Sequence, residues 1–156
     1  MIPPPPPPPP PSFANAPPTP IPPTRPVVSK SRPAGAFLVE LFIFNAFPYK
    51  DHWAYWVSCG NDSTKGNYIH AFGDVSNGFN FEIRRNHDCS DPSDKPTERI
   101  ALEWVDAQYF DERMLNQGVA KITAEPVCGF EESLSKVKVP EKSLNVVTDK
   151  VSLLLK

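Results

Sequence analysis

The sequence predicts an α+β fold, in which an antiparallel sheet of four to five strands is followed by C-terminal helices and preceded by a disordered proline-rich tail. Three observations support this prediction. Residues 1–35 hold 16 of the 21 prolines. Short apolar runs separated by turn-forming residues fill the middle of the chain. Further on, apolar residues recur at helical spacing. We therefore divide the chain into a tail, residues 1–35, and a single α+β domain, residues 36–156.

The tail has too little apolar surface to offset the entropy lost on ordering, because Phe13 is its only aromatic residue. Its proline runs are typical of local polyproline II conformation. Its charges are all basic, whereas the domain carries 13 Lys and Arg against 18 Asp and Glu, a net charge of −5. Since nucleic-acid binding needs a basic face, we expect no nucleic-acid partner for this domain.

The chain shows no sign of membrane insertion. No run approaches the ~18 apolar residues that a membrane span needs, and prolines occupy the place of a signal peptide. We therefore expect a cytoplasmic protein without a membrane span. The three cysteines, Cys59, Cys89 and Cys128, are odd in number and widely spaced, which favours neither a disulfide framework nor a paired zinc motif. No cofactor is expected.

Four or five strands are expected in the domain. Residues 36–44 are almost continuously apolar and too short for a typical helix, a pattern typical of a central strand covered on both faces. Residues 52–59 are rich in aromatic side chains and suit a second strand. A polar loop is predicted over residues 60–67. The other expected strands are residues 68–72, residues 79–84 and, as a fifth, residues 99–105.

Two helices are expected after these strands. Residues 105–115 fit a helix with Asp106 as its N-cap and the Asn-Gln-Gly stretch at 116–118 as its end. Residues 128–137 place apolar residues three or four positions apart, as in an amphipathic helix. Residues 147–156 fit either a short helix or a strand.

Two histidines are the candidate chemistry of the domain. His52 opens the aromatic strand, and His70 lies late in the next strand. Strands joined by a short loop pair antiparallel, so an offset of about one residue pair places both rings on one face as direct or diagonal neighbours. Such a pair fits a base with an orienting partner, a metal site, or two unrelated structural histidines. No third ligand occurs at a characteristic spacing, so no metal is expected.

The stretch VELFIFNAFPYKDHWAYWV, followed by YIHAF, resembles the opening of the lecithin:retinol acyltransferase-like family, which has a permuted papain-like fold. The resemblance covers roughly residues 37–145 and implies that His52 is the base for a thiolate nucleophile and that His70 orients it. The chain also resembles a group of uncharacterised fungal proteins with the same HWAYWV…IHA pattern.

The nucleophile that this resemblance implies is missing from its expected place. In that family a cysteine in an Asn-Cys stretch opens a later helix, and no such stretch follows Cys128. Cys59 lies seven residues past His52, roughly 23 Å away at ~3.3 Å per residue and on the opposite face. Cys89 falls in a polar loop. Cys128 remains the candidate nucleophile, because a helix N-terminus would lower its pKa. We expect a C-terminally incomplete or degenerate acyltransferase or hydrolase that is inactive as written.

The tail indicates an alternative, non-enzymatic function. Pro20, Pro23 and Arg25 fit the P-x-x-P-x-R pattern that SH3 domains recognise. Residues 3–11 form a pure proline run of the kind that WW or EVH1-type modules bind. Residues 3–26 could therefore recruit such a partner and make the protein an adaptor, although an inert linker fits the same composition.

Overall fold

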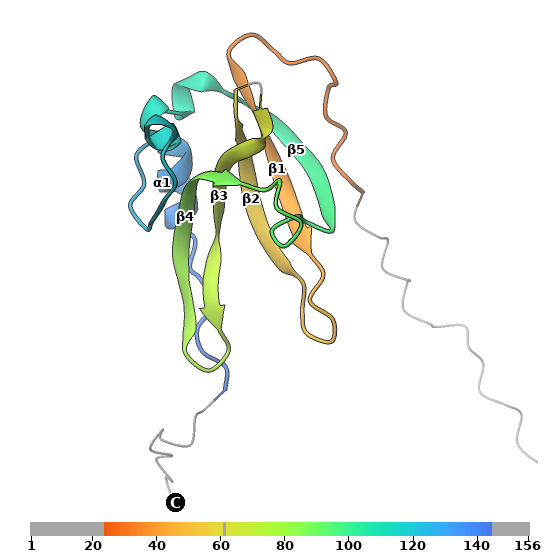
Figure 1. Cartoon of the computed structure of the whole chain (residues 1–156), viewed down its shortest axis with the longest axis vertical. Coiled ribbons are helices and arrows are strands. Elements are labelled where there is room, and N and C mark those ends of the chain that lie inside the picture. The colour runs from red at the N-terminus through yellow and green to blue at the C-terminus, as the bar shows by residue number, and fades with distance from the viewer. Residues whose placement is uncertain (1–23, 61, 145–156) are drawn as a thin grey trace, which may run out of the picture.

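The computed structural model describes residues 24–60 and 62–144, which form one antiparallel sheet (Figure 1). The strand order is β5-β1-β2-β3-β4-β6. The strands are β1 (Ala36–Phe44), β2 (His52–Cys59), β3 (Asp62–Asp74), β4 (Gly78–Asp88), β5 (Glu98–Asp106) and β6 (Lys121–Thr123). The helices of this described part are α1 (Gly129–Ser135) and two 3-10 helices, η1 (Ala107–Tyr109) and η2 (Glu112–Gly118).

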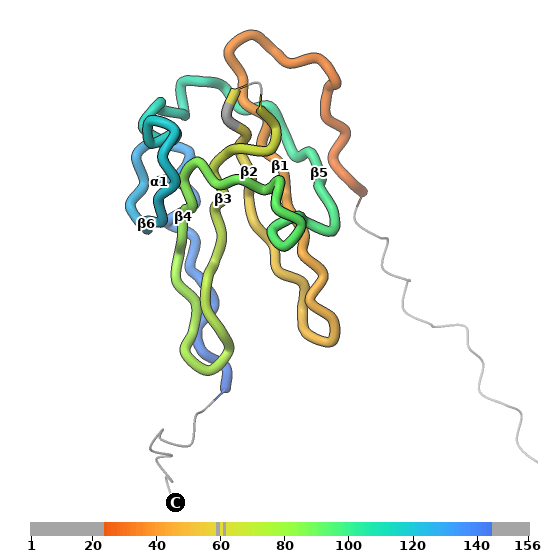
Figure 2. The backbone as a smooth tube through the Cα atoms, in the orientation of Figure 1, coloured from red at the N-terminus to blue at the C-terminus, as the bar shows by residue number. Residues whose placement is uncertain are grey.

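One face of the sheet is covered by the connection from β4 to β5. Because β5 lies beyond β1 in the strand order, residues 89–97 must cross the sheet, and Figure 2 shows this crossing. Main-chain bonds hold its two ends: Cys89 N–H donates to the Thr64 carbonyl, and Thr97 N–H donates to the Ile43 carbonyl. The residues buried under it form the aromatic core, which comprises Phe42, Ala54, Trp56, Tyr68 and Cys89.

Close packing in this core depends on a glycine. Phe42 and Trp56 stack with ring centroids 4.8 Å apart. At Gly66, beside a register shift between β3 and β4, a Cβ atom would come within 2.4 Å of the Val57 carbonyl oxygen and 2.8 Å of the Trp56 ring. Glycine therefore lets β3 approach β2 closely while the large indole stays buried.

On the opposite face, α1 lies beside β4 (Figure 1), and a buried ion pair attaches the two elements. Arg85 Nη1 and Nη2 donate to the two carboxylate oxygens of Glu131, at 2.7 and 3.0 Å. Arg85 Nη2 also donates to the Glu125 carbonyl, and the Val127 N–H donates to Glu131. Both side chains are almost completely buried, so every one of these bonds replaces a contact with water.

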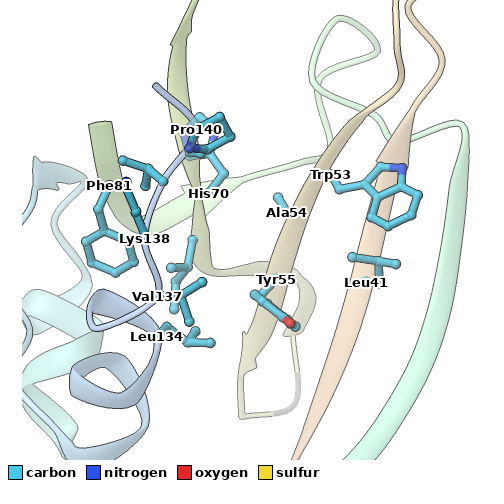
Figure 3. A pocket seen from close by; sticks show the side chains of 13 residues that line it. Leu41, Trp53, Ala54, Tyr55, His70, Phe81, Leu134, Val137, Lys138 and Pro140 are labelled. Atoms are coloured by element: carbon cyan, nitrogen blue, oxygen red, sulfur yellow. The ribbon is translucent and has the colours of Figure 1, made fainter. Parts of the chain in front are cut away.

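An apolar groove lies on the same face (Figure 3). One of its sides is formed by the middle strands of the sheet, and the other by α1 and the segment that follows it. Leu41, Trp53 and Tyr55 form its sheet side, and Leu134 and Val137 face them. Trp53 is 60% exposed there, which is high for an indole. This face is therefore less completely covered than the aromatic core.

The predicted antiparallel sheet is confirmed, and the helix expected over residues 128–137 is present as α1, but the molecule is mostly β and its described part has no second α-helix. Six strands and one seven-residue α-helix occupy the described residues. The predicted helix over residues 105–115 is wrong. There β5 continues to Asp106, whose side chain caps η1 by accepting from Gln108 N–H, and Asp111 caps η2 in the same way. Two successive caps start two short turns in place of one helix.

The predicted end of this segment is confirmed, because η2 stops at the Asn-Gln-Gly stretch. Asn116 and Gln117 have φ values of 44° and 55°, and Gly118 has φ 77°. Such left-handed conformations terminate a helical segment.

The strand bounds also differ from the prediction. β3 begins at Asp62 rather than at residue 68, so most of the predicted polar loop is paired strand, and β6 was not predicted. Main-chain hydrogen bonds form the ladder whatever the side chain, so exposed polar residues can extend a strand. In β1 only Ala36, Val39 and Phe42 are buried. The prediction that this strand is covered on both faces was therefore wrong.

The described part of the tail, residues 24–35, contains no helix or strand but does contact the domain. Trp104 Nε1 donates to the Ser29 carbonyl at 2.8 Å, and Arg32 Nε donates to the Ala36 carbonyl at 2.8 Å. These two bonds attach the otherwise largely exposed segment to the domain. Residues 1–23, with Pro20 and Pro23, and residues 147–156 lie outside the described residues. No helix in the described part is long and apolar enough to cross a membrane.

Candidate functional site

The two predicted histidines meet on one face of the sheet. Ala54 of β2 pairs with His70 of β3, so His52 is the diagonal neighbour of His70. His70 Nδ1 lies 2.9 Å from His52 Nε2. The predicted strand pairing and the shared face are thus confirmed.

A glutamate that sequence reasoning missed continues this chain of contacts. Glu82 of β4 pairs directly with His70, and its Oε1 lies 3.0 Å from His70 Nε2. Arg84 Nε donates to the same carboxylate oxygen at 2.8 Å. The available signal was the alternation of Glu82 and Arg84 along β4, which places both on one face, but their alignment with His70 depends on the hairpin register. We call Glu82, His70 and His52 the histidine relay.

The charges of the inner part of the relay follow from burial and hydrogen bonding. Burial works to raise the pKa of Glu82, but the hydrogen bonds from Arg84 and His70 outweigh it and leave the pKa below its usual value. Burial lowers the pKa of His70, and the bond to Glu82 opposes this only in part. At neutral pH, Glu82 is therefore ionised and His70 is neutral. His70 then donates its Nε2–H to Glu82, which leaves Nδ1 as an acceptor.

This assignment fixes the proton on His52 as well. Because His70 Nδ1 accepts, His52 donates from Nε2, and the lone pair of His52 is on Nδ1. Tyr68 Oη lies 3.0 Å from the same Nε2 and accepts from the same N–H as a second acceptor. Burial and then the charge of Arg84 lower the pKa of His52. Within the described residues nothing hydrogen-bonds His52 Nδ1, so this nitrogen is a free base.

His52 and His70 of the histidine relay line one side of a polar cleft of about 390 Å³. Phe44 and Phe72 add aromatic walls, and the crossing segment contributes Ser93 and Asp94. A third histidine, His87, also lines the cleft, with Nε2 3.8 Å from Asp94 Oδ2. Burial lowers the pKa of His87 although Asp94 opposes the shift. All three histidines are therefore uncharged at neutral pH.

One comparison places this site within a family. The family model described as a family of unknown function, DUF6540, matches residues 39–152. The chain belongs to the DUF6540 family. No curated protein and no solved structure matches it. The histidine relay lies entirely inside the DUF6540 match, whereas the proline-rich tail lies outside it.

The DUF6540 domain does not bring Cys128, the predicted nucleophile candidate, to the histidine relay. Cys128 is the N-cap of α1, and Glu131 of this helix binds Arg85. Since Arg85 alternates with Arg84 along β4, α1 lies on the face opposite to the histidines. Burial raises the pKa of Cys128, and the neighbouring backbone N–H groups oppose this only in part. The predicted lowering of its pKa is wrong.

The other two cysteines are also remote from His52. Cys89 is buried beside Trp56 in the aromatic core. Trp56 lies four residues along β2 from His52, which corresponds to ~13 Å at ~3.3 Å per residue. Burial raises its pKa. Cys59 is at the far end of β2, where it pairs with Asp62. The strand positions of Cys59 and Cys89 and the face on which α1 lies therefore separate the cysteines of the described residues from His52.

Two further findings concern the predictions for a metal site and for an SH3 partner. Within residues 24–60 and 62–144, no three His, Cys, Asp or Glu side chains are grouped so that they could hold a metal ion. Arg25, predicted to serve an SH3 partner, forms an ion pair of 2.5 Å with Glu98 of β5. Its side chain remains 70% exposed, so it is accessible from solvent.

Proposed function

We propose that this domain is a permuted papain-like Cys/His acyltransferase or hydrolase fold that retains its base and orienting residue, lacks the nucleophile, and is inactive as it stands. The observation that carries the proposal is the histidine relay, in which ionised Glu82 and neutral His70 leave the lone pair of His52 on Nδ1. A base that is oriented through its second nitrogen is the arrangement a thiol nucleophile requires.

The relay supports a definite sequence of proton transfers. A thiol at His52 Nδ1 would give its proton to that nitrogen, and the thiolate would attack an acyl carbonyl carbon. The resulting imidazolium would be stabilised through His70 by the negative charge of Glu82. The same proton would then pass to the leaving group as it departs. Without a sulfur the base alone contributes little, because the two groups act as a unit.

The base can be tested by supplying the missing sulfur. Phe44 of β1 pairs directly with His52, so Phe44→Cys places a thiol next to the ring. We expect His52 to lower the pKa of this thiol below the ~8.5 of free cysteine. The measurement is the pH dependence of alkylation by iodoacetamide, followed by peptide mass spectrometry so that each cysteine is read separately.

Two controls make the result specific. Adding His52→Gln to the Phe44→Cys variant should return the alkylation rate of the introduced thiol to that of an ordinary cysteine. Ile43→Cys, one residue earlier and on the opposite face, should show no dependence on His52. Equal alkylation profiles with and without His52 would show that the ring does not act as a base, and the proposal would fail.

The chain with its own cysteines should not react in this way. A thiol-reactive acyl ester probe should not label it in a His52-dependent manner, because no described cysteine reaches His52. Labelling of Cys128 that is lost in His52→Ala would contradict the proposed inactivity and make Cys128 the nucleophile.

A second proposed function is that of a cytoplasmic adaptor that recruits an SH3, WW or EVH1-type domain through residues 3–26. The observation that favours it is the state of Arg25, which is largely exposed and forms a surface ion pair with Glu98. Such pairs contribute about 0–1 kcal/mol, so a reader could take Arg25 from Glu98 at small cost.

A further inference from the structure

A separate cavity of about 260 Å³ lies under η1 and η2, at the end of the sheet where β2 finishes. Val57 and Asn67, which pair across β2 and β3, form its floor. Since Val57 alternates with Trp56, this floor belongs to the sheet face opposite to the histidines. The apolar walls are Phe37, Phe110 and Met114.

The floor of this cavity contains a buried polar group without a partner. Asn67 is 1% exposed, and no group among residues 24–60 and 62–144 donates a hydrogen bond to its Oδ1. Its Nδ2 donates none within the part of the chain that the structure describes. A buried amide in this state destabilises a protein, and native structures contain few of them. Asn67 lies at a register shift between β3 and β4.

We propose that this cavity binds a small neutral molecule with an apolar body and an amide-like N–H and C=O pair, such as a carboxamide or a lactam. Asn67 offers one acceptor and one donor side by side, which is the complement of an amide. The walls fit an apolar or aromatic body. A charged ligand is not favoured. The nearby Asp111 carboxylate already accepts from the side chain and from the backbone N–H of Arg113, so its charge is not available to a ligand.

The test uses benzamide as the probe and ethylbenzene as its apolar counterpart, each titrated into the full chain and followed by saturation-transfer NMR. We expect Asn67→Leu to weaken benzamide binding at least about tenfold, because the bound amide would lose both partners. Ethylbenzene should bind this variant at least as tightly as the unmodified chain. The variant should also be as stable as the unmodified chain or more so, since it removes an unpaired buried amide.

A second variant keeps Asn67 and fills the cavity. Leu115 lines the opening and is partly exposed, so Leu115→Trp should block both probes without disturbing the sheet. Val137→Trp, in the apolar groove of Figure 3, is the matched control and should leave benzamide binding unchanged.

The outcomes separate the alternatives. Loss of benzamide binding in Asn67→Leu and Leu115→Trp, with retention in Val137→Trp, supports the site. Absence of benzamide binding to the unmodified chain at millimolar concentration overturns it and leaves water as the occupant. Binding that survives Leu115→Trp also overturns it, because the probe would then lie elsewhere; this criterion decides the test even if Asn67→Leu fails to fold. None of these results depends on the histidine relay.

Discussion

At the residue scale, burial decides the charge of the cleft. His52, His70 and His87 each have a pKa lowered first by burial, and the positive charge of Arg84 lowers each further. The folded protein therefore binds fewer protons at these rings than the unfolded chain does just below pH 6.5. The relay is in its base form at neutral pH for the same reason.

This proton difference predicts that stability falls on mild acidification. Because the unfolded histidines take up protons first, the free energy of unfolding should decrease from about pH 7 downward, through 6.5 and toward the lowered folded pKa values. Urea denaturation at pH 7.5 and pH 5.5 measures the change. In the triple variant His52→Gln, His70→Gln, His87→Gln, the decrease over this interval should disappear. A decrease that persists in that variant would assign it to other groups.

Glu82, the acidic residue of the histidine relay, affects the stability in a different pH range. The pKa of Glu82 is lowered, so its contribution is present above its unfolded pKa of about 4.5 and is lost only as the pH falls below that value. The interval between pH 7.5 and pH 5.5 therefore reports on the histidines and not on Glu82.

At the scale of elements, the ion pair between Arg85 and Glu131 decides where α1 lies. A helix of seven residues has little stability of its own, so it depends on this contact with β4. Both charges are out of water, and the carboxylate also holds the chain that leads into α1 through the Val127 N–H.

Breaking this pair should destabilise the domain strongly. Arg85→Met leaves Glu131 as a buried unpaired charge and should cost about 3–5 kcal/mol in the free energy of unfolding. The double variant Arg85→Met, Glu131→Leu should recover much of that loss. Lys136→Met, which removes the exposed pair with Glu132, should change the stability by less than about 0.5 kcal/mol. Urea denaturation of all three checks this, and equal losses in the single and double variants would contradict it.

At the scale of the whole molecule, the end of the tail lies against the domain. The Ser29 carbonyl accepts from Trp104 of the edge strand β5, and Arg25 pairs with Glu98 of the same strand. A segment placed along an edge strand also shields it from pairing with another chain.

Shortening the tail should therefore have a measurable effect once Ser29 is lost. A chain beginning at residue 32, which keeps Arg32 and its bond to the Ala36 carbonyl, should be less stable than one beginning at residue 24 by about 0.5–1.5 kcal/mol, the value of the hydrogen bond between Trp104 and Ser29. Thermal unfolding compares the two. In a Trp104→Phe background the difference should shrink, because the indole N–H is absent. Identical melting temperatures in the unmodified background would show that the tail contact contributes nothing.

The adaptor proposal has its own prediction at this scale. Arg25→Ala should weaken binding to an SH3 domain by about 1.5–3 kcal/mol, the value of a charge-assisted hydrogen bond. Glu98→Gln should leave binding unchanged or slightly tighter, because it frees Arg25. Calorimetric titration against a panel of SH3 domains measures both. If the Arg25→Ala variant bound every SH3 domain of the panel as tightly as the unmodified chain does, only the proline run of residues 3–11 would remain as a candidate binding motif.

The predictions that succeeded rest on local patterns. The aromatic run of β2 and the apolar run of β1 each predicted a strand, and the short loop between β2 and β3 predicted the antiparallel pairing of these two strands. The meeting of His52 and His70 follows from these alone, because side chains alternate along a strand. The Asp106 cap and the turn at residues 116–118 were equally local.

What the sequence by itself determined is thus the succession of strands from β1 to β5 and the position of two histidines on one face. Only the tertiary structure decided that Glu82 completes the relay, that Arg85 binds Glu131, and that Cys128 lies on the far side of the sheet. The physical reason is that these contacts depend on the register of β4 and on the path of the chain after it. A shift of one residue in that register would turn Glu82 away from His70 and exchange the two faces of β4.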